Sequence, residues 1–579
     1  IMELKTVQIN DRLKIGRPCI DATNVGYNIE WSQELRVEEA LREYVAGAML
    51  VHMLSSGGLL DGPITTHATQ TIYDMSVGYD LAGICSKPVR SFIERMKNAS
   101  EIVEQLRGRI PRELKKLREL DYPTRLSNGI TLSTFHGCPA DEIEKICTFL
   151  IGEMDCDVVV KMNPPMLGKE RLEHLLYDVM GYREITVQPH AYTSGLQFDE
   201  GVEICGRLGK LAASKNRGFG VKFSNTLEVT NHREFFTKDN KTQYLSGQPL
   251  HVITLTLANE FRKVVGPDVL FTFSAGVDRQ NFANMVACGY RPISVCTDLL
   301  RPGGYGRLPP YLTTLSAEME KCGARKIDEY IVRMSNGEPQ LLKASAKNLE
   351  RIVGETQLDP RYYAAANRKE PKRIDSRLDT FDCITCDKCL PVCPNAANFL
   401  FTATPQKISF SDWVVGNGSL EVGASREIVV ERPAQIANFA DFCNDCGNCD
   451  TFCPEYGGPF IKKPNFFGSY ESWASASRDG FFIDLCGDVR RMHGRYKSVS
   501  FFLEAEPHWG GWRFEDGRVC IFVREGDFSI ERWFAFGPAD ATGHVVNMEA
   551  FHTMRILLDS VLDTDRVHQV NVGLVRSES

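Results

Sequence analysis

Two cysteine motifs of identical spacing constrain this 579-residue chain more than any other feature. Both read C-x2-C-x2-C-x3-C-P, over residues 383–394 and over residues 443–454. This spacing is typical of a [4Fe–4S] cluster, because three thiolates on one tight loop can ligate three of its iron atoms. The fourth ligand must then approach from elsewhere in the chain.

Residues 383–460, which contain both motifs, resemble the bacterial-type two-cluster ferredoxins. In those proteins the fourth cysteine of each motif ligates the other cluster. The resemblance therefore implies two crossed ligand sets, one of Cys383, Cys386, Cys389 and Cys453, the other of Cys443, Cys446, Cys449 and Cys393. Zinc is the alternative for an isolated C-x2-C pair, but two full copies with proline in register favour clusters. Two such clusters carry electrons one at a time, so the chain needs an electron source and an electron sink.

The composition is that of a globular protein, with 43% hydrophobic and 25% charged residues, and the length suits about three or four domains. A net charge of −8 argues against nucleic acid as the main partner. No apolar run is long enough to span a membrane, and no signal peptide is evident. The oxygen sensitivity of the clusters predicts a cytoplasmic protein. Because the chain opens directly on a strand-like stretch, residues 1–9, we expect the natural N-terminus to lie further upstream.

Residues 1–312 alternate short apolar runs with amphipathic stretches. Eight runs are predicted strands: residues 2–9, 71–77, 129–133, 158–163, 185–188, 221–225, 270–274 and 293–297. This number of alternating strand and helix units favours an α/β fold in which a parallel sheet closes into a TIM (β/α)8 barrel. No G-x-G-x-x-G motif follows a strand, so a dinucleotide-binding domain is not predicted.

Three lysines lie at strand positions of the predicted barrel, Lys5, Lys161 and Lys222. The chemistry of a TIM barrel lies at the carboxyl ends of its strands, and a barrel interior rarely buries an unpaired ammonium. The three lysines therefore favour a bound anion or an electron-rich ring. Alternatively, each lysine extends to the rim of the barrel and stays solvated.

Five stretches of the chain match known families: residues 3–7, 132–139, 160–164, 220–226 and 296–305. Through them the barrel resembles the FMN-binding domain of dihydroorotate and dihydropyrimidine dehydrogenases. The whole chain more closely resembles the iron–sulfur oxidoreductases named as selenate reductase subunits, although no residue supports selenate chemistry. The related full-length proteins carry an FAD- and NAD(P)H-binding domain between barrel and ferredoxin. Here only residues 313–382 lie between them, and they predict a helical linker.

The resemblance of the barrel to the FMN-binding dehydrogenases also implies roles for single residues. The implied FMN contacts are Lys5, Thr6, Lys161, Lys222, Ser274, Gly276, Cys296 and Thr297. Asn163, Asn225 and Thr226 would bind a planar cyclic amide, because an amide side chain both donates and accepts hydrogen bonds.

The implied general acid is Cys138, on the loop that carries a catalytic cysteine in the dehydrogenases. The local order here is His-Gly-Cys-Pro, which makes His136 a second candidate. Alternatively, Cys138 only caps a helix that begins near Ala140.

The sequence thus predicts a barrel at 1–312, a linker at 313–382, a ferredoxin domain with an inserted hairpin at 383–460 and an α+β domain at 461–579. The predicted function is electron transfer between a partner redox subunit, two [4Fe–4S] clusters and FMN, acting on a pyrimidine- or purine-like heterocycle. The partner would be a flavoprotein, an NAD(P)H-oxidising subunit or a ferredoxin in a multi-subunit complex. The alternative is an electron-transfer or scaffold subunit of a larger, electron-bifurcating complex, without substrate chemistry of its own.

Overall fold

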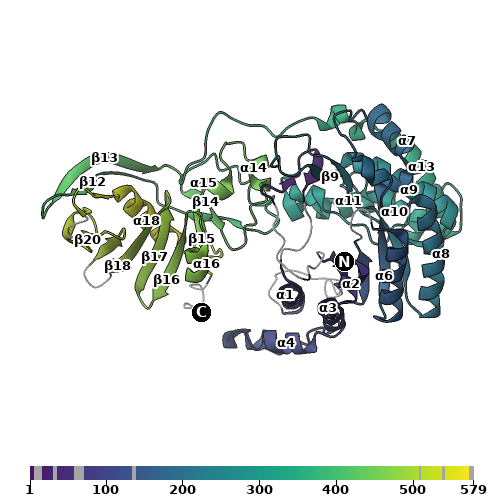
Figure 1. The fold of residues 1–579 in the computed structure, drawn as a ribbon, viewed down its shortest axis with the longest axis horizontal. Helices are drawn as coiled ribbons and strands as arrows, with labels where there is room; N and C mark the ends of the chain where they lie inside the picture. Colours follow the sequence, from purple (N-terminus) through teal and green to yellow (C-terminus); the bar gives the residue numbers. More distant parts are fainter. Residues whose placement is uncertain are drawn as a thin grey trace. The chain divides into compact units, whose positions relative to one another are not determined.

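The computed structural model describes residues 1–4, 9, 16–29, 35–57, 71–133, 138–506, 510–537 and 541–572. The chain divides into two compact units (Figure 1). The first comprises Ile1–Leu299 and Gly306–Glu370, and the second comprises Leu300–Tyr305 and Pro371–Ser579. The division falls inside the predicted linker, whose helices belong to the first unit.

Six strands of the first unit form one parallel sheet, in the order β1-β4-β5-β6-β7-β10. They are β1 (Met2–Glu3), β4 (Tyr73–Val77), β5 (Gly129–Leu132), β6 (Asp157–Met162), β7 (Phe219–Phe223) and β10 (Leu270–Phe273). Ile293 adds a parallel bridge to Phe273 at the β10 edge. Strands that pair in chain order and in parallel are connected by helical crossovers, as in part of a (β/α)8 barrel, but within the described residues the sheet has six strands where eight were predicted.

The helices of this unit have the following bounds: α1 (Val37–Ser56), α2 (Leu81–Ile84), α3 (Lys87–Lys97), α4 (Ser100–Arg107), α5 (Lys115–Arg118), α6 (Ala140–Gly152), α7 (Lys169–Glu173), α8 (Phe198–Ser214), α9 (Gln248–Val265), α10 (Phe282–Ala287), α11 (Pro309–Lys321), α12 (Ile327–Met334) and α13 (Leu341–Gln357). Strand β6 explains how the sheet separates its two faces. Val158, Val160 and Met162 are buried, whereas the alternate residues are partly exposed. Because side chains alternate along a strand, Lys161 lies on the face opposite these apolar residues.

Residues 185–188 do not form a barrel strand, so that prediction is wrong. Val187 instead makes an isolated antiparallel bridge with Val229, and β6 pairs directly with β7. Val229 belongs to a four-stranded antiparallel sheet of β2 (Ile20–Asp21), β3 (Val25–Asn28), β9 (Thr242–Gly247) and β8 (Leu227–Thr230). A short apolar run does not reveal which sheet it joins, so periodicity could not separate the two outcomes.

The second unit is built on a nine-stranded sheet in the order β11-β14-β15-β16-β17-β18-β19-β20-β21. The strands are β11 (Asn398–Thr402), β14 (Ala434–Phe439), β15 (Asn465–Phe467), β16 (Gly480–Cys486), β17 (Val489–Tyr496), β18 (Val499–Glu506), β19 (Gly511–Glu515), β20 (Val519–Arg524) and β21 (Ile530–Ala535). β12 (Gln406–Val415) and β13 (Leu420–Val430) form a long antiparallel hairpin, which β22 (Val545–Val546) extends.

One apolar core of this unit contains residues from both sides of the boundary predicted at residue 460. It combines Phe399 and Phe401 with Phe514 and with Phe551 of α18 (Met548–Val561). The shorter helices are α14 (Asn448–Phe452), α15 (Pro459–Lys462) and α16 (Tyr470–Ser475). The sheet and its core therefore run across the boundary predicted at residue 460. Within the residues that the structure describes, no helix is long and apolar enough to cross a membrane.

Candidate functional site

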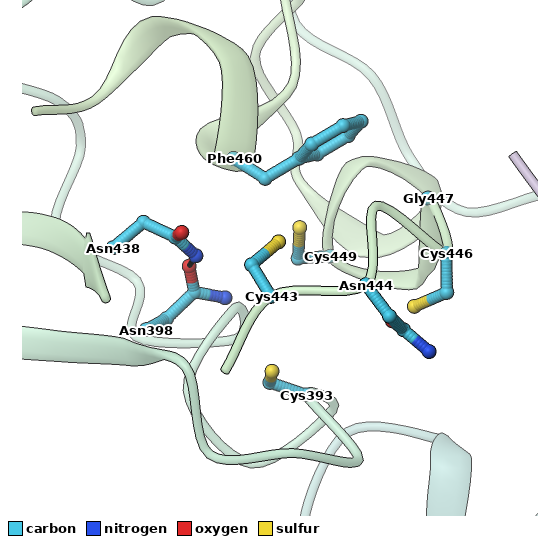
Figure 2. A pocket seen from close by; sticks show the side chains of 9 residues that line it. All are labelled: Cys393, Asn398, Asn438, Cys443, Asn444, Cys446, Gly447, Cys449 and Phe460. Carbon is cyan, nitrogen blue, oxygen red and sulfur yellow. Dashed lines mark hydrogen bonds between the residues drawn. The ribbon is translucent and has the colours of Figure 1, made fainter. Parts of the chain in front are cut away.

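Four cysteines line one cavity in the second unit. Figure 2 shows Cys443 and Cys446 on one loop, Cys449 in the helical turn that follows it and Cys393 reaching toward them from another loop, with the ring of Phe460 nearby. Cys393 belongs to the first motif and the other three belong to the second. The structure therefore brings together the four residues of one predicted ligand set.

The two cysteine loops share an unusual backbone conformation. The third residue of each motif, Thr385 or Asp445, has a positive φ, of 49° and 52°. The fifth residue, Asp387 or Gly447, has φ of 55° and 84°. Left-handed residues are costly outside glycine and persist only where the surrounding structure requires them. Their repetition at equivalent positions gives both loops the same curvature around their cysteines.

The other predicted set consists of Cys383, Cys386, Cys389 and Cys453. Burial, and then the charges of Cys453, Cys383 and Cys386, raise the pKa of the Cys389 thiol above its ordinary value. The backbone N–H of Ile384 donates to the carboxylate of Glu455 at 2.9 Å, which places the end of the second motif beside the first motif. Each loop is therefore completed by a cysteine of the other.

Zinc and a cubic cluster place different demands on four cysteine ligands. Tetrahedral zinc–thiolate bonds of about 2.3 Å hold the sulfur atoms roughly 3.8 Å apart. Across the described part of the chain, no group of three or more His, Cys, Asp or Glu side chains is arranged to hold a single metal ion. A cubic cluster separates its ligands further, because each thiolate binds a different iron atom. The four cysteines that line the cavity are residues of the kind that a cluster needs, one thiolate for each of its four iron atoms.

Buried asparagines hold the two loops in place. Asn448, next to Cys449, donates from Nδ2 to the carbonyl oxygens of Val392 and Leu300, both at 2.7 Å. Asn398 donates to the carbonyl of Cys389 at 2.9 Å and accepts from Asn438 at 3.0 Å. No pattern in the sequence singles out these asparagines, because an asparagine beside a cysteine carries no signal of its own.

A network of charged and polar side chains connects strands of the parallel sheet in the first unit. Lys222 donates to Glu3 and, at 3.1 Å, to the hydroxyl of Ser294. Ser294 donates to Glu3 at 3.2 Å. Glu3 lies on β1, Lys222 on β7 and Ser294 beyond β10, so side chains from both ends of the sheet meet. The sheet must therefore curve round until its two ends face each other.

Lys161 joins the same network. Its Nζ lies 3.8 Å from Glu3 Oε1 and 3.4 Å from Ser133 Oγ. Burial raises the pKa of Glu3, but the charges of Lys222 and Lys161 outweigh this effect and leave the pKa below its usual value. Burial and the neighbouring Lys222 charge lower the pKa of Lys161. Two ammonium groups thus share one carboxylate.

Two further polar side chains border this network. Asp74, paired with Glu3 in the sheet, accepts a hydrogen bond from Thr131. Burial raises the pKa of Asp74 to about 6. Thr272 pairs laterally with Lys222, and its buried hydroxyl has no hydrogen-bond partner among the described residues. An unpaired hydroxyl beside Lys222 suits a polar or anionic ring.

The residues predicted to contact a flavin lie in different surroundings. The side chain of Lys222 is 4% exposed, so the rim alternative does not hold for this lysine. Ser274 and Gly276 follow β10, and Gly276, with φ of 52°, approaches Gly247 too closely for any side chain. Cys296 is exposed, and the Thr297 hydroxyl lies 3.1 Å from that of Ser246. Lys5 and Thr6 lie outside the described residues.

The predicted substrate residues lie together where β6 and β7 end. Asn225 donates to Asn163 at 3.3 Å and accepts from the backbone N–H of Thr226 at 3.0 Å. Asn163 and Thr226 line one pocket together with His190 and Glu228. The His190 Nε2 lies 3.2 Å from Glu228 Oε2. No sequence pattern predicts either residue of this pair, because they belong to separate segments that only the fold brings together.

Cys138 is buried directly before α6. Its thiol lies 3.9 Å from the carbonyl oxygen of Pro139, which occupies the N-cap position without a side-chain cap hydrogen bond. The capping alternative is therefore wrong. Burial, and then the charges of Glu142 and Asp141, raise the pKa of Cys138 to about 12, so the thiol keeps its proton at neutral pH. His136 lies outside the described residues.

A protein-family model supports the oxidoreductase and TIM-barrel predictions. The model described as "Oxidoreductase YgfK, N-terminal TIM-barrel domain" matches residues 1–350. The "Putative oxidoreductase YgfK" of Escherichia coli (strain K12) is 33% identical over 354 residues, covering 58% of this chain and 33% of that protein. The protein of the same name from Escherichia coli O157:H7 gives the same figures. The chain thus spans about one third of the length of these relatives.

Solved structures of lower similarity include two of DHODH from Eimeria tenella. The ligand-free form has a TM-score of 0.32 at 12% identity, over 56% of this chain and 79% of that chain. The complex with ferulenol has a TM-score of 0.33 at 12% identity, over 56% and 76%.

Proposed function

Because the chain belongs to the YgfK oxidoreductase family through its N-terminal TIM-barrel domain, we propose that it is an iron–sulfur flavoprotein. In this proposal two [4Fe–4S] clusters in a ferredoxin-like domain exchange electrons between a separate redox subunit and FMN in the barrel. The barrel acts on a small pyrimidine- or purine-like heterocycle. The partner is a flavoprotein, an NAD(P)H-oxidising subunit or a ferredoxin, and the complex works in the cytoplasm.

The observation that carries the proposal is the position of Cys393. It lies far from the second motif in sequence, yet it lines the same cavity as Cys443, Cys446 and Cys449. A cluster bound by three cysteines of one loop needs a fourth ligand of this kind. In the other predicted ligand set the corresponding residue is Cys453, which would complete the three cysteines of the first motif.

Residues of the barrel suit a flavin and a planar substrate. Lys161 and Lys222 would face the flavin ring, with the unpaired Thr272 hydroxyl beside them. Bound FMN would combine single electrons into a two-electron transfer. Asn163 and Thr226 would hold the substrate, while Cys138 or His136 would supply a proton.

A cofactor assay on anaerobically purified protein tests this proposal. We expect about eight iron atoms, about eight sulfides and one FMN per chain. Zinc in place of iron, or iron near four atoms per chain, would contradict the two-cluster assignment.

The second candidate is an electron-transfer or scaffold subunit of a larger complex. One observation favours it: Glu3 already pairs with both lysines, so their charges are compensated within the protein. The same assay separates the candidates, because this one requires the clusters but no flavin.

A further inference from the structure

The pocket beyond β6 and β7 contains a pair of ionisable residues that the proposed function does not use. His190 and Glu228 line it together with Asn163, Thr226, Pro165 and Leu196. Amide and hydroxyl groups thus lie beside apolar side chains in one small space. Such a combination suits a compact planar ligand with its own donors and acceptors.

Glu228 is unusual because its carboxylate is buried without a lysine or arginine. Its side chain is 10% exposed, and its one side-chain partner among the described residues is His190. A buried carboxylate is costly unless a charge or a hydrogen bond compensates it. The imidazole is therefore the group that stabilises Glu228.

This contact fixes the orientation of the imidazole. A carboxylate only accepts hydrogen bonds, so the Nε2 atom of His190 carries the proton that faces Glu228. The other ring nitrogen, Nδ1, has no hydrogen-bond partner among the described residues and is available to a ligand. The backbone carbonyl of His190 accepts hydrogen bonds from the hydroxyl and N–H of Ser194, at 2.6 Å and 2.9 Å, which holds the segment in place.

A second histidine–carboxylate pair, His174 and Asp178, provides a comparison for His190 and Glu228. His174 lies 3.1 Å from Asp178 on one helical segment, and both side chains are more than 60% exposed. Water can solvate that carboxylate whether or not the histidine is charged. In the His190 pair the carboxylate is buried while the imidazole is 56% exposed, so the hydrogen bond from Nε2 is the side-chain contact that holds the buried carboxylate.

We propose that His190 exchanges a proton with the ligand of this pocket, and that the ligand is a small cyclic amide or imide. Glu228 acts as the positioning residue, while Asn163 and Thr226 contact the ring substituents. The inference rests on the proposed function and adds the proton-exchanging group of the substrate pocket. Cys138, the acid considered above, is not among the residues that line this pocket.

The proton step is balanced without a further reactant. The imidazolium gives its Nδ1 proton to a ring nitrogen or carbonyl oxygen of the ligand. One N–H bond breaks and one N–H or O–H bond forms. The histidine becomes neutral, the ligand gains one proton, Glu228 stays ionised and no electron moves.

Calorimetry with uracil and hypoxanthine as probes tests the proposal on the intact, anaerobically purified protein. Titrations in two buffers of different ionisation enthalpy count the protons taken up or released on binding. We expect wild-type protein to bind at least one probe with a proton change that varies between pH 5.5 and 8. In the His190→Gln variant, binding should weaken about tenfold or more and the pH-dependent proton change should disappear.

Two further variants complete the test. Glu228→Gln should also reduce the proton change, because it removes the carboxylate that holds the imidazole ring in its orientation. His174→Gln, the matched control, should behave as wild type. Binding of neither probe by wild-type protein, or an unchanged proton count in His190→Gln, would overturn the inference. Iron and sulfide assays on the same samples report separately on the cluster part of the proposed function.

Discussion

The cysteine loops and the barrel interior bring their functional residues together in different ways. Each cysteine motif places three candidate ligands by local spacing, and only one cysteine per set comes from the other motif. The barrel network instead joins Glu3, Lys161, Lys222 and Ser294, which lie on separate segments across the whole first unit. The first arrangement depends mainly on loop conformation, and the second depends on closure of the sheet.

This difference predicts different responses to mutation. A local site loses its cofactor when one ligand is removed, while the surrounding core remains packed. A distributed network also contributes to stability, because its charges are buried where the strands meet. Changes in the cysteine loops should therefore alter cofactor content, and changes in the network should alter folding stability.

The largest expected effect follows from Cys393→Ser. If Cys393 supplies the fourth ligand to the cysteines of the second motif, its loss should remove that cluster. Iron content should then fall from about eight to about four atoms per chain or fewer. Iron and sulfide assays with low-temperature EPR measure this change. The exposed Cys486 on β16 provides the control variant Cys486→Ser, and equal iron in both variants would rule out the crossed ligation.

Replacement of Lys222 by Met tests the other side of the comparison. The substitution leaves Glu3 with Lys161 as its one remaining ion-pair partner among the described residues. Breaking a buried ion pair from one side typically costs roughly 3 kcal/mol or more. We expect hydrogen exchange at β7 to accelerate accordingly, while iron content stays at the wild-type level.

Two further variants show whether the lost charge pair is the cause. Adding Glu3→Gln to Lys222→Met should restore part of the stability, because the uncompensated carboxylate is gone. The exposed Lys210 of α8 offers the control Lys210→Met, which should change β7 exchange little. A loss of iron in Lys222→Met would contradict the separation between cofactor content and barrel stability.

The sequence predicted the parts of the fold that local patterns determine. Apolar runs such as residues 129–133 and 270–274 correspond to β5 and β10, because buried parallel strands need continuous apolar segments. Residues 185–188 show the same pattern yet join an antiparallel neighbour. Strand partners depend on long-range packing, which apolar periodicity does not specify.

The same limit applies to the candidate sites. Lys161 and Lys222 were predicted from their strand positions, but their shared partner Glu3 was not. Its role depends on β1 meeting β7 across the interior. His190 and Glu228 were missed for the same reason, since neither residue stands in a recognisable motif. Spacing identifies residues that act within one loop, whereas residues that act across strands require the structure.

The smallest expected effect concerns pH and Asp74. Burial raises its folded-state pKa to about 6 from the usual 3.8. The folded barrel therefore binds this proton more tightly than the unfolded chain does. The contribution of Asp74 to stability is most favourable below pH 3.8 and declines as the carboxyl ionises through pH 6. Between pH 5 and pH 7.5 the decline should be about 1 kcal/mol, after allowance for partial exposure.

Asp74→Asn should remove this decline, so the variant should gain stability relative to wild type as the pH rises from 5 to 7.5. Urea unfolding, monitored by hydrogen exchange in strand β4, measures the free energy of unfolding of both proteins at each pH. Asp239 is exposed and provides the control variant Asp239→Asn. In this variant the free energy of unfolding should vary with pH as it does in the wild type. Parallel slopes for wild type and Asp74→Asn would show that Asp74 ionises as an ordinary carboxyl. The barrel network would then consist of Glu3 and its two lysines alone, and its pH response would no longer distinguish it from the cysteine loops.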